Sequence, residues 1–175
     1  MKNIKPHVKR WTDTIETVRL ALEENKTVLY MSDQGTPNVE DPGIELLQIA
    51  YRLHSKIISI PGPCSFITAL SVCPFYKGSF LYKGLLPQDS SARILELKKL
   101  SNLPYPLIIL DTPYRRNQLI YDCVKVFNTN RYALLALDIS GSDETYLYGN
   151  LNQICAKTKN IQKKLNFILI IDGKS

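Results

Sequence analysis

The stretch KTVLYMSDQGTPNVEDPG, residues 26–43, decides the fold that we predict for this sequence. Its opening run, KTVLYM, is β-branched and aromatic, which is typical of a buried strand. Turn-forming residues follow, among them Gly35 and Pro37. Asp41-Pro42 then predicts a helix start, because a carboxylate can cap free N–H groups and proline suits the first helical position. The stretch therefore predicts a strand, a loop and a helix in succession.

The residues on either side extend this pattern into a βαβ unit. Residues 56–60, KIISI, predict a second strand, which should lie parallel to the first with a right-handed crossover. An earlier helix is indicated by apolar residues at helical spacing: Trp11, Ile15, Val18 and Leu22. The helix between the two strands has an apolar face of its own: Ile44, Leu47, Ala50 and Tyr51. A third helix is predicted over residues 65–72.

The rest of the chain predicts a second α/β subdomain. Residues 72–78, with Pro74 and Gly78, break the pattern and are the expected linker. The predicted strands beyond it are residues 80–86, 107–111, 132–139, 145–148 and 167–171, and the predicted helices are residues 91–100 and 116–127. Adjacent late strands favour a mixed sheet. We therefore predict an α/β fold with a parallel-sheet subdomain over residues 1–74 and a mixed-sheet subdomain over residues 79–175.

Composition narrows the classes of function. The 175 residues carry 22 Lys and Arg against 16 Asp and Glu, a net charge of +6. This surplus fits a nucleic-acid partner, and it fits equally a lysine-rich composition of genomic origin. The cysteines are Cys64, Cys73, Cys123 and Cys155. None forms a C-x-x-C pair, so we expect reduced thiols in a cytoplasmic protein and no zinc site. The apolar runs are too short to span a bilayer, so no membrane partner is expected.

Two loops are candidates for a ligand site. The loop from Ser32 to Pro37 and the loop Pro61-Gly62-Pro63 each follow a predicted strand. Ligands of open α/β sheets bind beyond the carboxyl ends of strands, and Gly35 would let a ligand approach the backbone closely. Adjacent strand ends open onto one crevice, so we expect the two loops to lie side by side. The alternative is that both are plain turns.

The strings that carry these loops resemble a known family. MSDQGTPNVEDPG, followed by IPGPCSFITALS, resembles the S-adenosylmethionine site of the tetrapyrrole-methylase superfamily. Within it, the ribosomal RNA small subunit methyltransferase I family is most similar, with its pattern SDAGTP, DPG and PGPxAxxTALS. FLYKGLLP, LDTPYRRNQLI and FILIID resemble later segments of that family. The family's opening strand precedes Trp11 and has no counterpart here, which predicts an incomplete first subdomain and puts the activity of these 175 residues alone in question.

The resemblance implies a cofactor, a substrate and an assembly. It implies an S-adenosylmethionine-dependent, metal-free, two-domain homodimer that methylates a ribose 2′-hydroxyl of small-subunit ribosomal RNA. Two alternatives stay open: a methylase of porphyrin or corrin rings, and a degenerate binding or dimerisation module without activity. The residues that the resemblance places against the cofactor are Ser32, Asp33, Gly35, Thr36, Pro37, Pro61, Gly62, Pro63, Ser65, Thr112 and Ala136.

Residues 137–144, LDISGSDE, depart from the family's R-E-L-T-K-x-x-E. Leu137 replaces the arginine and Gly141 the lysine, whereas Asp138 and Glu144 match the two acidic positions. We predict that these two carboxylates activate the hydroxyl, with solvated strand-end carboxylates as the alternative. Arg115 and Arg116 are predicted to hold a substrate phosphate, or else to be surface arginines that open a helix.

Overall fold

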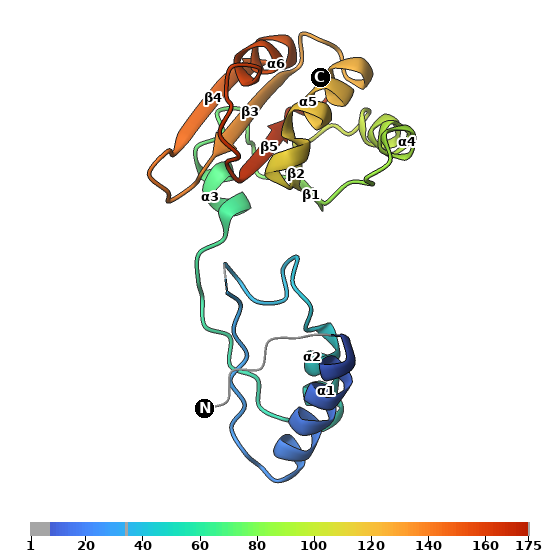
Figure 1. The fold of residues 1–175 in the computed structure, drawn as a ribbon, viewed down its shortest axis with the longest axis vertical. Coiled ribbons are helices and arrows are strands. Elements are labelled where there is room, and N and C mark those ends of the chain that lie inside the picture. The colour runs from blue at the N-terminus through green and yellow to red at the C-terminus, as the bar shows by residue number, and fades with distance from the viewer. Residues whose placement is uncertain (1–7, 34, 175) are drawn as a thin grey trace. The chain divides into compact units, whose positions relative to one another are not determined.

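The computed structural model describes residues 8–33 and 35–174 (Figure 1). They divide into two compact units, Met1–Cys64 and Ser65–Ser175. The division falls earlier than the predicted linker, which lies inside the second unit as an irregular connection.

The first unit is built around two helices. α1, Val8–Glu23, confirms the helix predicted from the apolar spacing, and α2, Ile44–Arg52, packs against it. The N-cap of α2 is Gly43, without a side-chain cap. The predicted capping role of Asp41 is wrong, because the Asp41 carboxylate instead accepts a hydrogen bond from the Ser32 hydroxyl.

The two strands predicted for the first unit are wrong. Within residues 8–33 and 35–64 no strand is formed, and residues 26–31 and 56–60 are irregular. Their apolar side chains are open to solvent: Leu29 is 55% exposed, Ile58 72% and Ile60 75%. A β-branched run suits a pleated surface but becomes a strand only when a neighbour pairs with its backbone. Neither run has such a neighbour among the described residues, so the predicted parallel sheet is not formed there.

The second unit holds one five-stranded sheet. Its order is β1-β2-β5-β3-β4. The strands are β1 Leu81–Gly84, β2 Leu107–Asp111, β3 Tyr132–Leu137, β4 Thr145–Asn150 and β5 Phe167–Ile171. β1 and β2 are parallel and the other pairs are antiparallel, which confirms the predicted mixed sheet.

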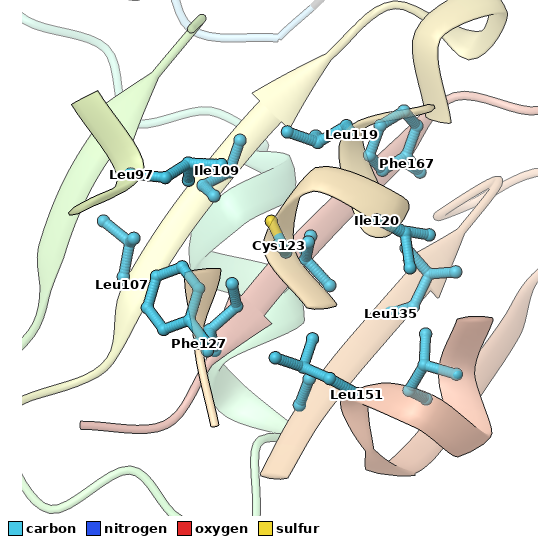
Figure 2. Close-up of a cluster of buried hydrophobic side chains, with 14 of the residues drawn as sticks. Leu97, Leu107, Ile109, Leu119, Ile120, Cys123, Phe127, Leu135, Leu151 and Phe167 are labelled. Atoms are coloured by element: carbon cyan, nitrogen blue, oxygen red, sulfur yellow. The ribbon is translucent and has the colours of Figure 1, made fainter. Parts of the chain in front are cut away.

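Helices cover both faces of this sheet. α4 Ser90–Leu100, α5 Arg116–Val126 and α6 Leu151–Thr158 pack on one face, with a 3-10 turn at Pro113–Arg115 before α5. Figure 2 shows Cys123 of α5 at the centre of this core, with Leu97 and Ile109 on one side and Leu135 and Leu151 on the other. α3, Ser65–Ser71, buries Ala69 and Leu70 on the opposite face (Figure 1). This packing places α3 in the second unit.

The helix α6 was not predicted from the sequence. It begins at a capping box in which the Asn150 side chain accepts from the Gln153 N–H, and the Gln153 side chain accepts from the Asn150 N–H, each at 3.0 Å. It buries Leu151 and Ile154 against β3 and α5. The capping pair is visible in the sequence, but the helix is only 8 residues long and gives a weak periodic signal.

Candidate functional site

The first unit brings its two predicted cofactor loops together. The Thr36 hydroxyl donates a hydrogen bond of 3.0 Å to the carbonyl of Pro63. Gly35 has φ +76°, a backbone conformation that favours glycine, and a Cβ built there would lie 3.8 Å from the same carbonyl. The prediction that the two loops lie side by side is therefore confirmed, although the strands expected to place them are not formed.

Local contacts hold the loop after residue 31 in shape. Beyond the bond between Ser32 and Asp41, the Tyr30 hydroxyl donates to the Pro42 carbonyl at 2.5 Å. A side chain at Gly43 would overlap the Tyr30 ring, so the ring packs directly against the backbone at Gly43. Asp33 is exposed and Pro37 half-buried, whereas Gln34, within the same motif, lies outside the described residues.

The second unit gathers other predicted residues at one edge of its sheet. The registers align Asp111, Phe167, Leu137 and Thr145 in one row across β2, β5, β3 and β4. Thr112 and Asp138 directly follow this row at the ends of β2 and β3. Ala136 lies one row inside, fully buried on the α3 face. Ser65 is exposed at the start of α3. The predicted cofactor residues are thus divided between the two units.

The turn between β3 and β4 contains both predicted catalytic carboxylates. Asp138 (φ +50°) accepts a hydrogen bond of 2.9 Å from the Asp143 N–H. Glu144 accepts one of 2.5 Å from the Ser140 N–H and one of 2.8 Å from the Tyr146 hydroxyl. These two donors, the backbone first, hold the pKa of Glu144 below its ordinary value. Both carboxylates thus stabilise the turn that carries them.

The same turn explains the glycine at position 141. The Gly141 N–H donates to the Asp138 carbonyl at 2.7 Å, and a Cβ at position 141 would overlap the Asp138 carboxylate. The carboxylate therefore occupies the space that a side chain at 141 would need. The family pattern has a lysine at position 141, and in this turn the Asp138 carboxylate leaves no room for that side chain.

The two arginines predicted to bind substrate are engaged by the chain itself. Arg115 donates from Nε to Asp111 Oδ1 at 2.7 Å. Arg116 is 3% exposed and donates to the carbonyls of Ile161 at 2.6 Å and Lys163 at 3.2 Å. Burial lowers the pKa of Arg116. The alternative prediction, that Arg116 is an exposed arginine at the start of a helix, is therefore wrong. Its hydrogen bonds fix the segment that follows α6.

A pocket that the sequence analysis missed lies beside the β3–β4 turn. It has a volume of about 470 Å³ and is lined by Leu137, Thr145 and Leu147 of the sheet and by the segment with Ile161, Lys163 and Leu165. Lys163 pairs with Asp143 of the turn at 2.7 Å. A signal for it was present in the sequence, because residues 145–171 contain four lysines and no Asp or Glu.

Over residues 8–33 and 35–174, no three His, Cys, Asp or Glu side chains are grouped so that they could bind a metal ion. No helix in the same ranges has the length and apolarity needed to cross a membrane.

Comparison with known proteins assigns the family. The profile of the tetrapyrrole (corrin/porphyrin) methylases matches residues 1–155. A Ribosomal RNA small subunit methyltransferase I from Buchnera aphidicola subsp. Schizaphis graminum is 36% identical over 156 residues, which are 87% of this chain and 54% of that protein. One from Escherichia coli O157:H7 is 31% identical over 160 residues, 90% of this chain and 56% of that protein. The chain spans about half the length of these curated relatives.

Solved structures agree on the fold. The methyltransferase CobJ superposes with a TM-score of 0.65 at 12% identity, covering 98% of this chain and 73% of that one. A uroporphyrin-III C-methyl transferase from Thermus thermophilus, in complex with S-adenosyl homocysteine, superposes with a TM-score of 0.58 at 18% identity, covering 90% and 72%. With the profile match over most of its length, the chain belongs to the tetrapyrrole (corrin/porphyrin) methylase family.

Proposed function

We propose that this chain is part of an S-adenosylmethionine-dependent methyltransferase that methylates a ribose 2′-hydroxyl of small-subunit ribosomal RNA. The family membership and the names of the two relatives support the reaction and the substrate class. The observation that carries the cofactor site is the hydrogen bond between Thr36 and Pro63, which joins the two loops.

The loops of the first unit fit a cofactor that approaches the backbone closely. A Cβ at Gly62 would meet no described atom within 4 Å, and one at Gly35 would meet only the Pro63 carbonyl at ordinary contact distance. Gly35, Thr36 and Pro37 would lie against the methionine part, and Pro61, Gly62, Pro63 and Ser65 against the adenosine. Ser32 and Asp33 would support the first loop. Thr112 and Ala136, in the second unit, are cofactor candidates by the resemblance alone. S-adenosylmethionine, when bound, supplies a methyl group on a positively charged sulfur.

Asp138 and Glu144 belong to the acceptor side of the proposed site. Methyl transfer to a hydroxyl depends on alignment of the reacting atoms, and a base assists by taking the proton. Glu144 is a weak base because its pKa is lowered by the Ser140 N–H and the Tyr146 hydroxyl. We therefore assign Glu144 to shaping the β3–β4 turn. From the resemblance alone we propose Asp138, on the same turn, as the group that accepts the proton. From the same resemblance we propose a cytoplasmic homodimer with the small ribosomal subunit as its partner.

Calorimetry with S-adenosylmethionine and S-adenosylhomocysteine tests the cofactor site. The blocking variant is Gly62→Trp, because position 62 is exposed and its backbone is not in the left-handed region, so the indole fills the loop without backbone strain. Lys98→Trp, on the exposed side of α4, is the control for added bulk. We expect micromolar binding by the wild-type chain and by Lys98→Trp, and at least a tenfold loss for Gly62→Trp.

Two outcomes would count against the proposal. Absence of binding by a chain that unfolds cooperatively would favour the degenerate module. Transfer of a radiolabelled methyl group to a tetrapyrrole, and not to small ribosomal subunits that lack the modification, would favour the ring methylase. Transfer to the subunits, lost with Gly62→Trp, is the result that we expect.

A further inference from the structure

The pocket beside the β3–β4 turn combines an apolar floor with polar walls. Leu137, Leu147 and Leu165 line it from the sheet and from the segment before β5. Thr145 contributes a hydroxyl, and the amide side chains of Asn160 and Gln162 line the same pocket. Its volume of about 470 Å³ lies within the range of small-ligand sites. A planar ring or sugar suits such a floor, and hydrogen-bonding groups at the ring edge suit the hydroxyl and the amides.

The charge at the pocket is positive. Lys157, in the last turn of α6, and Lys163 line it together with one acidic residue, Asp143, which pairs with Lys163 at 2.7 Å. Two lysines and one aspartate leave the lining with a net charge of +1. Lys159 and Lys164 belong to the same segment and extend the charge beyond the pocket, and Lys164 Nζ lies 4.3 Å from the centre of the Tyr114 ring. An anion with an apolar or planar part therefore matches the pocket, and the lysines outside it favour an extended anion.

A buried arginine holds the wall of the pocket. Arg116 donates hydrogen bonds to the carbonyls of Ile161 and Lys163, the two residues that flank Gln162. Charge-assisted hydrogen bonds from a residue that is 3% exposed keep this irregular segment in one conformation. These bonds fix the wall of the pocket formed by residues 161–163.

The pocket is also linked to the proposed acceptor side. Lys163 pairs with Asp143 at 2.7 Å, and the Asp143 N–H donates to the Asp138 carboxylate at 2.9 Å. Leu137 and Thr145, which line the pocket, are the two residues paired at the base of the same turn. A polymer with one residue in the pocket would therefore extend past Asp138.

We infer that this pocket binds one nucleotide of a single-stranded RNA acceptor, with Lys157 and Lys163 at its phosphates and the apolar floor under its sugar or base. The inference rests on the proposed function, which it deepens by placing the nucleic acid on the second unit. The proposed cofactor loops lie in the first unit and the pocket lies in the second. Cofactor binding and RNA binding by the pocket can therefore be tested independently.

Binding of a fluorescein-labelled single-stranded RNA of about ten nucleotides tests the inference, by anisotropy at several salt concentrations. The double variant Lys157→Gln/Lys163→Gln should bind at least tenfold more weakly. The slope of log K against log salt concentration should decrease in magnitude by about one to two. Lys98→Gln/Lys99→Gln removes the same charge from α4 and should change the affinity less than twofold. Thr145→Trp fills the pocket without a change in charge and should also weaken binding about tenfold.

Two further measurements make the result specific. Asp143→Asn breaks the same ion pair as Lys163→Gln but keeps the lysine, so it should retain or increase RNA affinity. Each of the four nucleoside 5′-monophosphates should compete only weakly, because a mononucleotide lacks the neighbouring phosphates that Lys159 and Lys164 would contact. Strong competition would assign the pocket to a free nucleotide and overturn the RNA inference.

The inference is overturned if the wild-type chain does not bind the RNA, if both lysine pairs cause the same loss, or if Thr145→Trp binds like wild type. S-adenosylmethionine binding is measured on every variant by calorimetry. Unchanged cofactor binding with lost RNA binding is the expected pattern. Cofactor binding with no effect of any pocket variant on RNA would remove this inference and leave the proposed function standing.

Discussion

The Thr36 hydroxyl and the Pro63 carbonyl are joined by a 3.0 Å hydrogen bond across 27 residues of sequence. This bond connects two loops that each contain a glycine and that lie in a unit without strands among its described residues. Since no sheet places the loops there, their relative position depends on this contact and on the bonds of Ser32 and Tyr30 to the segment before α2.

Thr36→Val should weaken cofactor binding without unfolding the chain. Valine keeps the shape of threonine but removes the donor, and a hydrogen bond of this kind contributes about 1 kcal/mol. We expect a three- to tenfold loss of S-adenosylmethionine affinity by calorimetry. Thr17→Val is the matched control, because its hydroxyl donates to the Asp13 carbonyl within α1. Equal affinities for both variants would show that the loop contact is not needed.

Gly141→Ala should destabilise the second unit through its clash with Asp138. The added Cβ overlaps the Asp138 carboxylate, which must then leave the Asp143 N–H. We expect a loss of about 1–3 kcal/mol in the free energy of unfolding, measured by urea denaturation. In Asp138→Ala the same substitution should be nearly neutral, so the double-mutant cycle should give a clear coupling energy. Additive effects would contradict the close contact.

Asp122→Ala should be among the most destabilising substitutions in the second unit. Asp122 is fully buried and accepts from Arg93 Nε at 2.9 Å and Nη2 at 2.6 Å, which joins α4 to α5. Its loss leaves a buried guanidinium without its counter-ion, which costs about 3–5 kcal/mol. Arg19→Ala breaks the exposed pairs of α1 and should cause a much smaller shift of the urea midpoint. Similar shifts for both variants would refute this ranking.

Tyr146→Phe should raise the pKa of Glu144, measured by NMR titration of the side-chain carboxyl. The phenol donates to Glu144 at 2.8 Å and, with the Ser140 N–H, lowers this pKa below that of an unfolded glutamate. Because the folded pKa is the lower one, the stabilisation from Glu144 is fully present above the unfolded value of about 4.3 and is lost as pH falls through the folded pKa. Tyr148→Phe, on the same strand, should leave the titration unchanged. An unshifted Glu144 in Tyr146→Phe would show that the backbone donor alone lowers the pKa.

The second unit could be predicted well because its signals are local. The strand 107–111 and the strand 167–171 have the predicted bounds, and the end of β3 differs by only two residues. Strands that are buried on both faces have continuous apolar runs, which can be recognised in the sequence without knowing which strands pair with them. α6 was missed because eight residues offer little periodicity.

The first unit shows what local signals cannot provide. Residues 26–31 and 56–60 have strand composition, but a strand also needs a hydrogen-bonded neighbour, and sequence composition does not contain that neighbour. The proximity of the two loops was nevertheless predicted, although its expected cause, the adjacent ends of two parallel strands, is not present among the described residues.

By itself, the sequence determined the α/β class, the mixed sheet and the family, since these depend on local pattern and on motifs that survive divergence. Only the tertiary structure decided the partners of the charged residues. Arg116 is buried and donates hydrogen bonds to two backbone carbonyls. Asp138 and Glu144 accept hydrogen bonds from N–H groups of their own turn. Lys157 and Lys163 line the same pocket. The physical reason is that a charged side chain is defined by what lies within a few ångströms of it, and those neighbours come from distant parts of the chain.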